Sequence, residues 1–174
     1  MSTPLFDVAA TEQPETPTRY TERDVLDWLR DKYTRVRIGT NADRYVRAEH
    51  ARYPSSFGTA TRIADYIVLD TYGGSRVLGF EVKVSRSDWL AELRDPTKAD
   101  EWKRHCHAWY LVVPDTSIVR SDLPDDWGLM APNAAGSLTI RHHSTLPDPQ
   151  PMTVDVLASL GRSIAQTATR EATR

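Results

Sequence analysis

The sequence predicts an α/β fold in which a central mixed β-sheet is flanked by helices. Segments with the helical spacing of apolar residues alternate with short runs of β-branched and apolar residues, the pattern expected of helices and strands that share one core. The turn Tyr72-Gly73-Gly74-Ser75 joins two of these runs into a hairpin. A helical stretch then separates the hairpin from the apolar run 109–113, which is the connection that parallel strands require.

The chain of 174 residues is long enough for one domain with a substantial core. Hydrophobic residues make up 40% and charged residues 26%, as in ordinary globular proteins. Residues 1–18 are rich in Thr, Pro and Glu, and we expect a disordered arm there. Residues 19–146 form the predicted domain, and residues 147–174 form a linker and a C-terminal helix that packs on or beside it.

Four helices are expected from capping and spacing. Thr21 and Asp24 form a capping box at the start of a helix over 22–33. Ser85 caps a second helix over 86–94, and Thr97 caps a third over 98–106. The last helix, over 152–163, has an apolar stripe formed by Val154, Leu157, Leu160 and Ile164.

Strands are expected between these helices. The hairpin strands cover 63–70 and 76–84, and the buried strand covers 109–113. Shorter strands are expected at 36–38, 45–49, 129–130 and 137–141.

The strand that contains Glu81 and Lys83 carries the most informative pattern. Side chains alternate along a strand, so Glu81 and Lys83 project from one face, and their apolar neighbours project from the other. A carboxylate and an ammonium group are costly to bury and are not needed for folding. Together with Asp65 they could hold a hard divalent cation and handle a water molecule beside it, which is the outline of a phosphodiester-hydrolysis site. The alternative is a cross-strand surface ion-pair cluster of little energetic value.

The hairpin register decides whether Asp65 joins this pair. Directly opposite residues of an antiparallel hairpin have numbers with a constant sum. A loop centred on Gly73 places Asp65 opposite Glu81, and a loop centred on Gly74 places it opposite Lys83. A two-residue turn would send Asp65 to the wrong face. We therefore expect a loop of odd length, or a bulge.

Positive charge gathers upstream of this hairpin. Residues 30–62 contain eight Arg or Lys against three acidic residues, although the whole chain has a net charge of −2. A basic track beside an acidic metal site fits phosphate binding, and a solvated face is the alternative. The predicted DNA-binding residues are Arg44, Arg47, Arg52, Lys98 and Lys103.

Cysteine content and hydropathy bear on location. Cys106 is the single cysteine, so no intramolecular disulfide can form and a reducing cytoplasm fits. No apolar run is long enough for a membrane span, and the N-terminus lacks a secretion signal pattern. We expect a cytoplasmic protein with no membrane partner.

Asp65 on one strand, Glu81-Val82-Lys83 on the next, and then a helix and an apolar strand resemble the PD-(D/E)XK nuclease superfamily. A longer likeness, over about residues 45–115, is to MmcB-type DNA repair proteins and their bacteriophage relatives. It is carried by the runs Gly79-Phe80-Glu81-Val82-Lys83-Val84-Ser85-Arg86-Ser87-Asp88-Trp89-Leu90, Leu93-Arg94-Asp95-Pro96 and Trp109-Tyr110-Leu111-Val112-Val113-Pro114. The chain departs from the superfamily name at Ala64, where that name has proline.

The resemblance implies a restriction-endonuclease-like αβββαβ core and Mg²⁺-dependent cleavage of DNA, with Mn²⁺ able to substitute. Asp65 and Glu81 would be metal ligands, and the backbone carbonyl of Val82 a third. Lys83 would orient or help deprotonate the attacking water, and an adjacent ion would push it toward its neutral form.

The superfamily often places a glutamate upstream of the aspartate. Glu49 is the candidate for that catalytic role, and Glu22 on the first helix is the alternative.

Two classes of function follow from these residues. The first is a metal-dependent deoxyribonuclease of DNA repair or phage DNA metabolism, and a restriction-like defence or phage-processing enzyme would use the same chemistry. The second is a non-catalytic DNA-binding or assembly module that keeps the nuclease fold. Retention of Asp65, Glu81 and Lys83 favours the enzyme. A homodimer would suit cleavage of both DNA strands, and the sequence leaves it open.

Overall fold

The computed structural model describes residues 19–39, 42–54 and 62–173, so the predicted arm at 1–18 lies outside the described residues. Six strands form one sheet in chain order: β1 (Tyr45–Arg52), β2 (Ile63–Asp70), β3 (Arg76–Val82), β4 (Ala108–Val112), β5 (Gly128–Pro132) and β6 (Leu138–His142). The pairs β3–β4 and β4–β5 are parallel and the other pairs are antiparallel. The predicted mixed sheet is confirmed.

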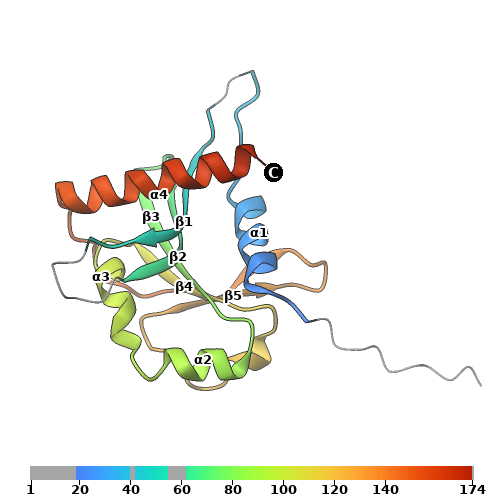
Figure 1. Cartoon of the computed structure of the whole chain (residues 1–174). Helices are drawn as coiled ribbons and strands as arrows, with labels where there is room; N and C mark the ends of the chain where they lie inside the picture. The colour runs from blue at the N-terminus through green and yellow to red at the C-terminus, as the bar shows by residue number, and fades with distance from the viewer. Residues whose placement is uncertain (1–18, 40–41, 55–61, 174) are drawn as a thin grey trace, which may run out of the picture.

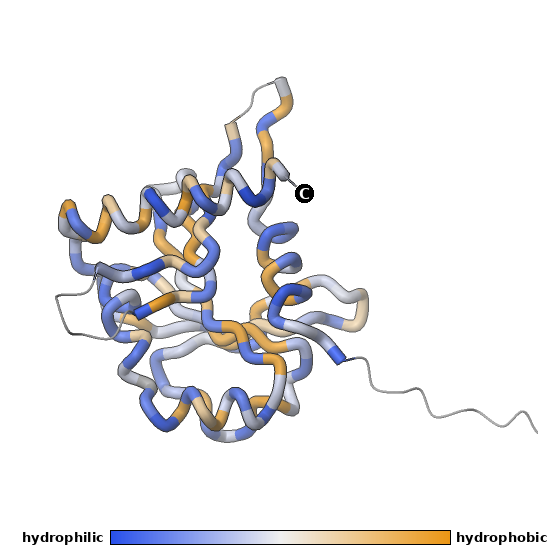
Figure 2. Tube along the Cα trace, viewed as in Figure 1, coloured by the Kyte–Doolittle hydropathy of each residue, from blue (hydrophilic) through white to orange (hydrophobic). Residues whose placement is uncertain are grey.

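Helices cover both faces of the sheet (Figure 1). They are α1 (Glu22–Lys32), α2 (Arg86–Glu92), α3 (Asp100–Lys103) and α4 (Val154–Ala172), with 3₁₀ turns η1 (Pro96–Ala99) and η2 (Thr116–Ile118). The apolar side of α1 packs in one core against Tyr66, Phe80 and Val82. The other core joins α2, α3 and α4 to the opposite face, around Ile67, Trp109 and Leu111. Hydrophobic segments of the trace accordingly concentrate along the strands in the middle of the molecule (Figure 2).

Two helices begin where capping chemistry predicts. At α1 the backbone N–H of Asp24 donates to the Thr21 hydroxyl, and Asp24 Oδ2 accepts the backbone N–H of Thr21. At α2 the Ser85 hydroxyl accepts the N–H of Asp88. These caps satisfy N–H groups that have no partner within the helix. They set the first residues of two helices that contribute to the candidate site.

The segment after α2 differs from the prediction. A continuous helix over 98–106 was expected, but the chain forms the 3₁₀ turn η1 and then the four-residue helix α3. Thr97 does not cap α3, because the residue lies inside η1. Its hydroxyl donates a hydrogen bond of 2.5 Å to the carboxylate of Asp95. Pro96 is the first residue of η1, a position at which proline is favoured in helical turns.

The predicted strand at 36–38 is reduced to a single bridge between Val36 and Asp43. By contrast, β1 is longer than predicted, because it continues past Glu49 to Arg52. This extension matters for the site, because it lengthens β1 alongside the start of β2.

Helix α4 is longer than expected, and a different side of it is buried. Val154 and Leu157, two members of the predicted stripe, are 80% and 53% exposed. The other two members are confirmed, since Leu160 is buried and Ile164 packs against the core. The buried face consists of Leu160 together with Val156, Ser163 and Thr167. Apolar spacing missed this face because half of it is made of hydroxyl residues.

Those hydroxyls bond to the outer edge of β1. Thr167 Oγ1 accepts the N–H of Glu49 at 2.9 Å, and Ser163 Oγ accepts the N–H of Arg52 at 3.4 Å. Ser159 donates to the Arg52 carbonyl at 2.7 Å. Helix α4 therefore takes the place of a neighbouring strand and covers an edge that would otherwise be open to pairing. Among the described residues, no helix combines the length and the hydropathy needed to cross a bilayer.

Candidate metal and catalytic site

The β2–β3 register brings Asp65 to Glu81, as the odd-loop prediction requires. Tyr66 pairs with Phe80 and Asp70 pairs with Arg76, so opposite residues sum to 146. Continued by one residue, this register sets Asp65 opposite Glu81, on the other face of the sheet from Tyr66 and Phe80. The loop 71–75 between the strands has odd length, and the predicted juxtaposition is confirmed.

The ladder between β2 and β3 ends at this point, and the Asp65 side chain takes over the pairing. The backbone N–H of Val82 donates to Asp65 Oδ2 at 2.8 Å, while the next N–H, of Lys83, donates to the Val112 carbonyl of β4. In a strand, the N–H and C=O of one residue point to the same side. The Val82 carbonyl, the third metal ligand expected from the resemblance, therefore points to the side of Asp65.

Lys83 bridges two carboxylates. Its Nζ lies 2.5 Å from Glu81 Oε1 and 3.4 Å from Glu92 Oε2. Glu81 and Lys83 are each more than nine-tenths buried, and the Glu92 side chain is 13% exposed. With Asp65, three carboxylates thus surround one ammonium group, and water screens them weakly.

The pKa values of these groups follow from that imbalance. Burial, and then the charge of Asp65, raise the pKa of Glu81 to about 8, against the opposing effect of Lys83. Burial also raises the pKa of Asp65, although Lys83 and the Val82 N–H oppose it. For Lys83, burial lowers the pKa, but the charges of Glu81 and Asp65 outweigh it and raise the pKa overall. The protein groups alone therefore keep Lys83 protonated; a push toward the neutral form would have to come from a bound ion.

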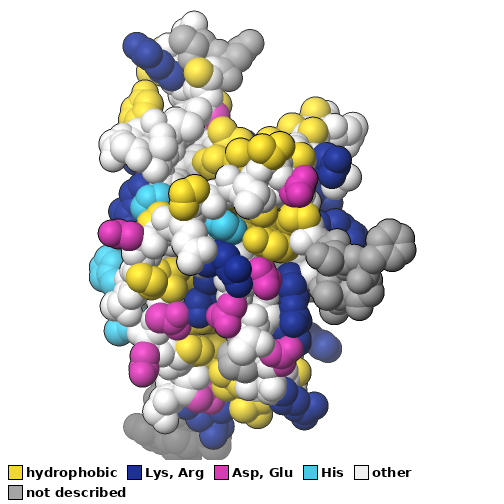
Figure 3. Space-filling model, turned by 90° about the vertical axis from the view of Figure 1, so that its left-hand side faces the viewer, with side chains coloured by type: hydrophobic (Ala, Val, Ile, Leu, Met, Phe, Trp, Pro, Cys, Tyr) yellow, Lys and Arg dark blue, Asp and Glu magenta, His cyan; other side chains and the backbone are white. Residues whose placement is uncertain are grey.

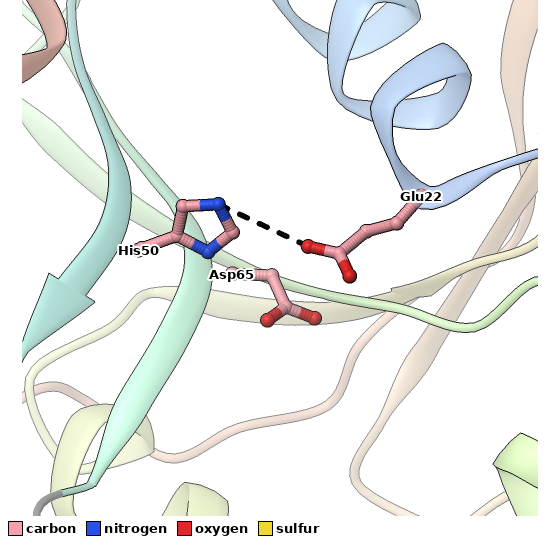
Figure 4. Close-up of side chains that lie close together, drawn as sticks. All are labelled: Glu22, His50 and Asp65. Atoms are coloured by element: carbon pink, nitrogen blue, oxygen red, sulfur yellow. Dashed lines mark ion pairs between the residues drawn. The ribbon is translucent and has the colours of Figure 1, made fainter.

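Helix α1 and strand β1 add two side chains beside Asp65 (Figure 4). Glu22 comes from the first residue of α1, and His50 lies opposite Asp65, between the paired positions Glu49–Tyr66 and Ala51–Ala64. One potential ligand atom from each of Glu22, His50 and Asp65 lies within 4.8 Å of the others. Glu22, the alternative for the upstream glutamate, is thus the one that the fold brings to Asp65.

Glu49 does not join this cluster. Its partner Tyr66 lies in the core beneath α1, and paired residues project from the same face of a sheet, so the Glu49 side chain lies on the α1 side, not on the face of Glu81. Both carboxylate oxygens accept hydrogen bonds from Arg23, at 3.0 and 2.8 Å, and the residue is 3% exposed. This bidentate pair ties α1 to β1. Glu49 therefore holds the helix that carries Glu22.

Three of the predicted DNA-binding residues are engaged within the chain. Arg44 makes a two-pronged contact with Asp70, Arg47 pairs with Asp43 and Glu171, and Lys103 pairs with Asp126 and Asp100. Arg44 and Arg47 belong to the basic stretch 30–62, so these pairs neutralise part of its excess charge.

The other two predicted DNA-binding residues, Arg52 and Lys98, are exposed. Within the described ranges, no ion pair is formed by either of them. On the face shown in Figure 3, basic and acidic side chains are interspersed rather than gathered by sign.

Sequence reasoning missed Glu92 and His50. Glu92 lies in the last turn of α2, where only the return of that helix over β3 brings it to Lys83. His50 lies in the part of β1 beyond Glu49, which the predicted strand did not include. A β1–β2 register with a constant sum of 115 would have identified it.

No protein-family model matches the chain, and no curated protein matches it. A solved structure that it resembles is the SPO1766 protein of unknown function from Silicibacter pomeroyi, with a TM-score of 0.51 and 22% sequence identity. The match covers 74% of this chain and 77% of that one. Similarity at this level of identity indicates a shared α/β fold and does not extend to activity.

Proposed function

We propose that this protein is a divalent-metal-dependent nuclease that hydrolyses phosphodiester bonds in DNA. The observation that carries the proposal is the convergence of Asp65, Glu81 and Lys83 at the ends of β2 and β3. It lies at the carboxyl ends of the parallel strands β3 and β4, where open α/β sheets usually place their sites. A surface ion-pair cluster would be solvated, whereas Glu81 and Lys83 are buried.

The donor set fits a hard cation such as Mg²⁺. Asp65 and Glu81 offer carboxylate oxygens, and Val82 offers a carbonyl oxygen. Burial and then the charge of Asp65 raise the pKa of Glu81, and a bound cation would favour its charged form. A bound divalent ion supplies positive charge to the phosphate and makes a nearby water more acidic.

The side chains of this protein would then divide the remaining work. Lys83, held protonated by Glu81 and Glu92, would place a positive charge beside the scissile phosphate as its negative charge increases. Glu92 would keep Lys83 oriented once Glu81 is engaged elsewhere. The exposed Arg52 and Lys98 are the best remaining candidates for contacts to the DNA backbone, and Cys106, a buried unpaired thiol, fits the reducing cytoplasm.

The test is cleavage of a labelled DNA panel (single-stranded, duplex, nicked and flapped) with Mg²⁺ or Mn²⁺. We expect wild-type protein to cut at least one substrate and Glu81→Gln to lose that activity. The control is Asp88→Asn, which alters an exposed carboxylate on α2 and should cut normally. If no substrate is cut while DNA is still bound, the non-catalytic DNA-binding module replaces the nuclease.

A further inference from the structure

We propose that Glu22, His50 and Asp65 form a mixed nitrogen–oxygen site for a divalent transition-metal ion, with Mn²⁺ as the best probe. The inference rests on the proposed function in one respect, since Asp65 is shared with the candidate catalytic cluster. It adds a metal preference that Asp65, Glu81 and the Val82 carbonyl do not supply, because an oxygen-only set suits Mg²⁺.

The donor chemistry selects the class of ion. Imidazole nitrogen is a preferred ligand of first-row transition metals, whereas Mg²⁺ is bound almost wholly through oxygen. Carboxylates are among the ligands that suit Mn²⁺, and this paramagnetic ion reports directly whether an imidazole nitrogen joins them, so Mn²⁺ is the probe for this set. The three ligands come from three elements, α1, β1 and β2, so the site forms only in the folded chain (Figure 4).

The spacing is close to that of a coordination sphere. Ligand atoms about 2.1 Å from a shared ion lie about 3 Å apart at neighbouring octahedral positions and about 4.2 Å apart at opposite ones. Here all three atoms lie within 4.8 Å of one another, and His50 Nε2 is 3.9 Å from Glu22 Oε1. Binding of one ion would require the side chains to rotate toward one another, so that these separations shorten to coordination values.

The side chains of Glu22 and His50 are available to an ion. The separation of 3.9 Å is too long for a hydrogen bond, and neither side chain makes a hydrogen bond to any other part of the chain that the structure describes. Their exposed fractions of 52% and 40% leave a path from solvent. Asp65, which lies deeper, bonds Val82 through Oδ2 only.

The backbone of His50 points to the same conclusion. Its φ of +50° is left-handed, a conformation that is rare for a residue with a side chain and unusual in the middle of a strand. Such outliers persist where surrounding structure enforces them, and they cluster at ligand sites.

The test measures metal binding without DNA. We expect wild-type protein to bind Mn²⁺ with ¹⁴N coupling in pulsed EPR spectra, the signature of an imidazole ligand. His50→Asn, which tolerates the left-handed backbone, should lose that coupling and weaken Mn²⁺ binding by about tenfold or more, as loss of metal-site interactions commonly does. Its Mg²⁺ affinity should change less than Mn²⁺ affinity. The matched control is His142→Asn, which alters an exposed histidine on β6 and should leave both affinities unchanged.

Bound Mn²⁺ without nitrogen coupling, or equal Mn²⁺ affinity in wild type and His50→Asn, would overturn the inference. So would an absence of Mn²⁺ binding at millimolar concentration. If His50→Asn does not fold, His50→Gly keeps the backbone conformation and serves in its place. A protein that shows the nitrogen signature but cuts no DNA would retain this site and lose the nuclease proposal; DNA cleavage without the signature would do the reverse.

Discussion

Asp65 accepts a 2.8 Å hydrogen bond from the backbone N–H of Val82 through one carboxylate oxygen. The bond closes the β2–β3 ladder where the two strands stop pairing, and within the described residues the second oxygen makes no hydrogen bond of its own. One side chain thus serves both the fold and the proposed chemistry, and substitutions can separate the two.

Asp65→Asn should preserve the fold and remove the activity. The amide oxygen can still accept the Val82 N–H, while the lost charge removes a metal ligand. Asp65→Ala leaves that N–H without an acceptor and should lower the free energy of unfolding by about 1–3 kcal/mol. Urea denaturation and cleavage assays of the two variants check this. Equal destabilisation by Asn and Ala would contradict the structural part.

Thr167→Val should destabilise the attachment of α4 to the sheet edge. The substitution keeps the shape but removes the acceptor for the Glu49 N–H, so we expect a loss of about 1–3 kcal/mol in the free energy of unfolding. Thr169→Val is the control, because among the described residues its exposed hydroxyl donates only to the Ala165 carbonyl within the helix. A difference below experimental error between the two variants in chemical denaturation would argue against edge protection by α4.

Gly79 and Gly161 should respond in opposite ways to alanine. A Cβ on Gly79 would lie 2.2 Å from the Trp109 ring, in a core where neither strand can move freely, so we expect a loss of about 1–3 kcal/mol or more. A Cβ on Gly161 meets nothing within 4 Å, and alanine there should stabilise α4 by about 0.5–1 kcal/mol. Thermal melts of both variants measure the contrast. If both substitutions shifted the melting temperature in the same direction, the surroundings described for Gly79 or for Gly161 would be contradicted.

Acid stability should depend on Asp122. Hydrogen bonds from Arg86 and Trp89 on α2 lower its pKa to about 2, from an ordinary value of 3.8. Because the folded-state pKa is depressed, this stabilisation is complete above pH 3.8 and is lost as the pH falls toward 2. Asp122→Asn should therefore destabilise the protein at neutral pH and flatten the decline in stability between pH 4 and 2. The comparison is with Asp125→Asn, an exposed neighbour; parallel declines in all three proteins would contradict the assignment.

The sequence predicted the parts of this fold that depend on local chemistry. Capping at Thr21 and Ser85 places α1 and α2, and alternation with the glycine-rich turn sets Asp65 opposite Glu81. What escaped prediction depends on contacts between distant segments. The buried side of α4 is half hydroxyl, because Ser163 and Thr167 bond to β1 rather than fill an apolar core.

The contrast between local chemistry and long-range contacts also explains which residues of the candidate site could be predicted. Glu81 and Lys83 are neighbours on one strand, so periodicity finds them. Glu92 and His50 reach the site only through the return of α2 and the extension of β1. The prediction for Glu49 was wrong because its position along the strand does not indicate which face of the sheet holds the metal site. Arg23, its hydrogen-bond partner, comes from α1 rather than from a neighbouring strand.

The most direct measurement is the single-turnover rate of Mg²⁺-dependent DNA cleavage by wild type and Lys83→Met, with DNA affinity measured alongside. The substitution keeps the length and apolar stem of the side chain and removes the charge that lies between Glu81 and Glu92. We predict a fall of about 10²-fold or more in rate, with an intact fold and nearly unchanged DNA affinity. Cleavage by Lys83→Met at the wild-type rate would contradict the account and move the chemistry, if any, to another part of the molecule.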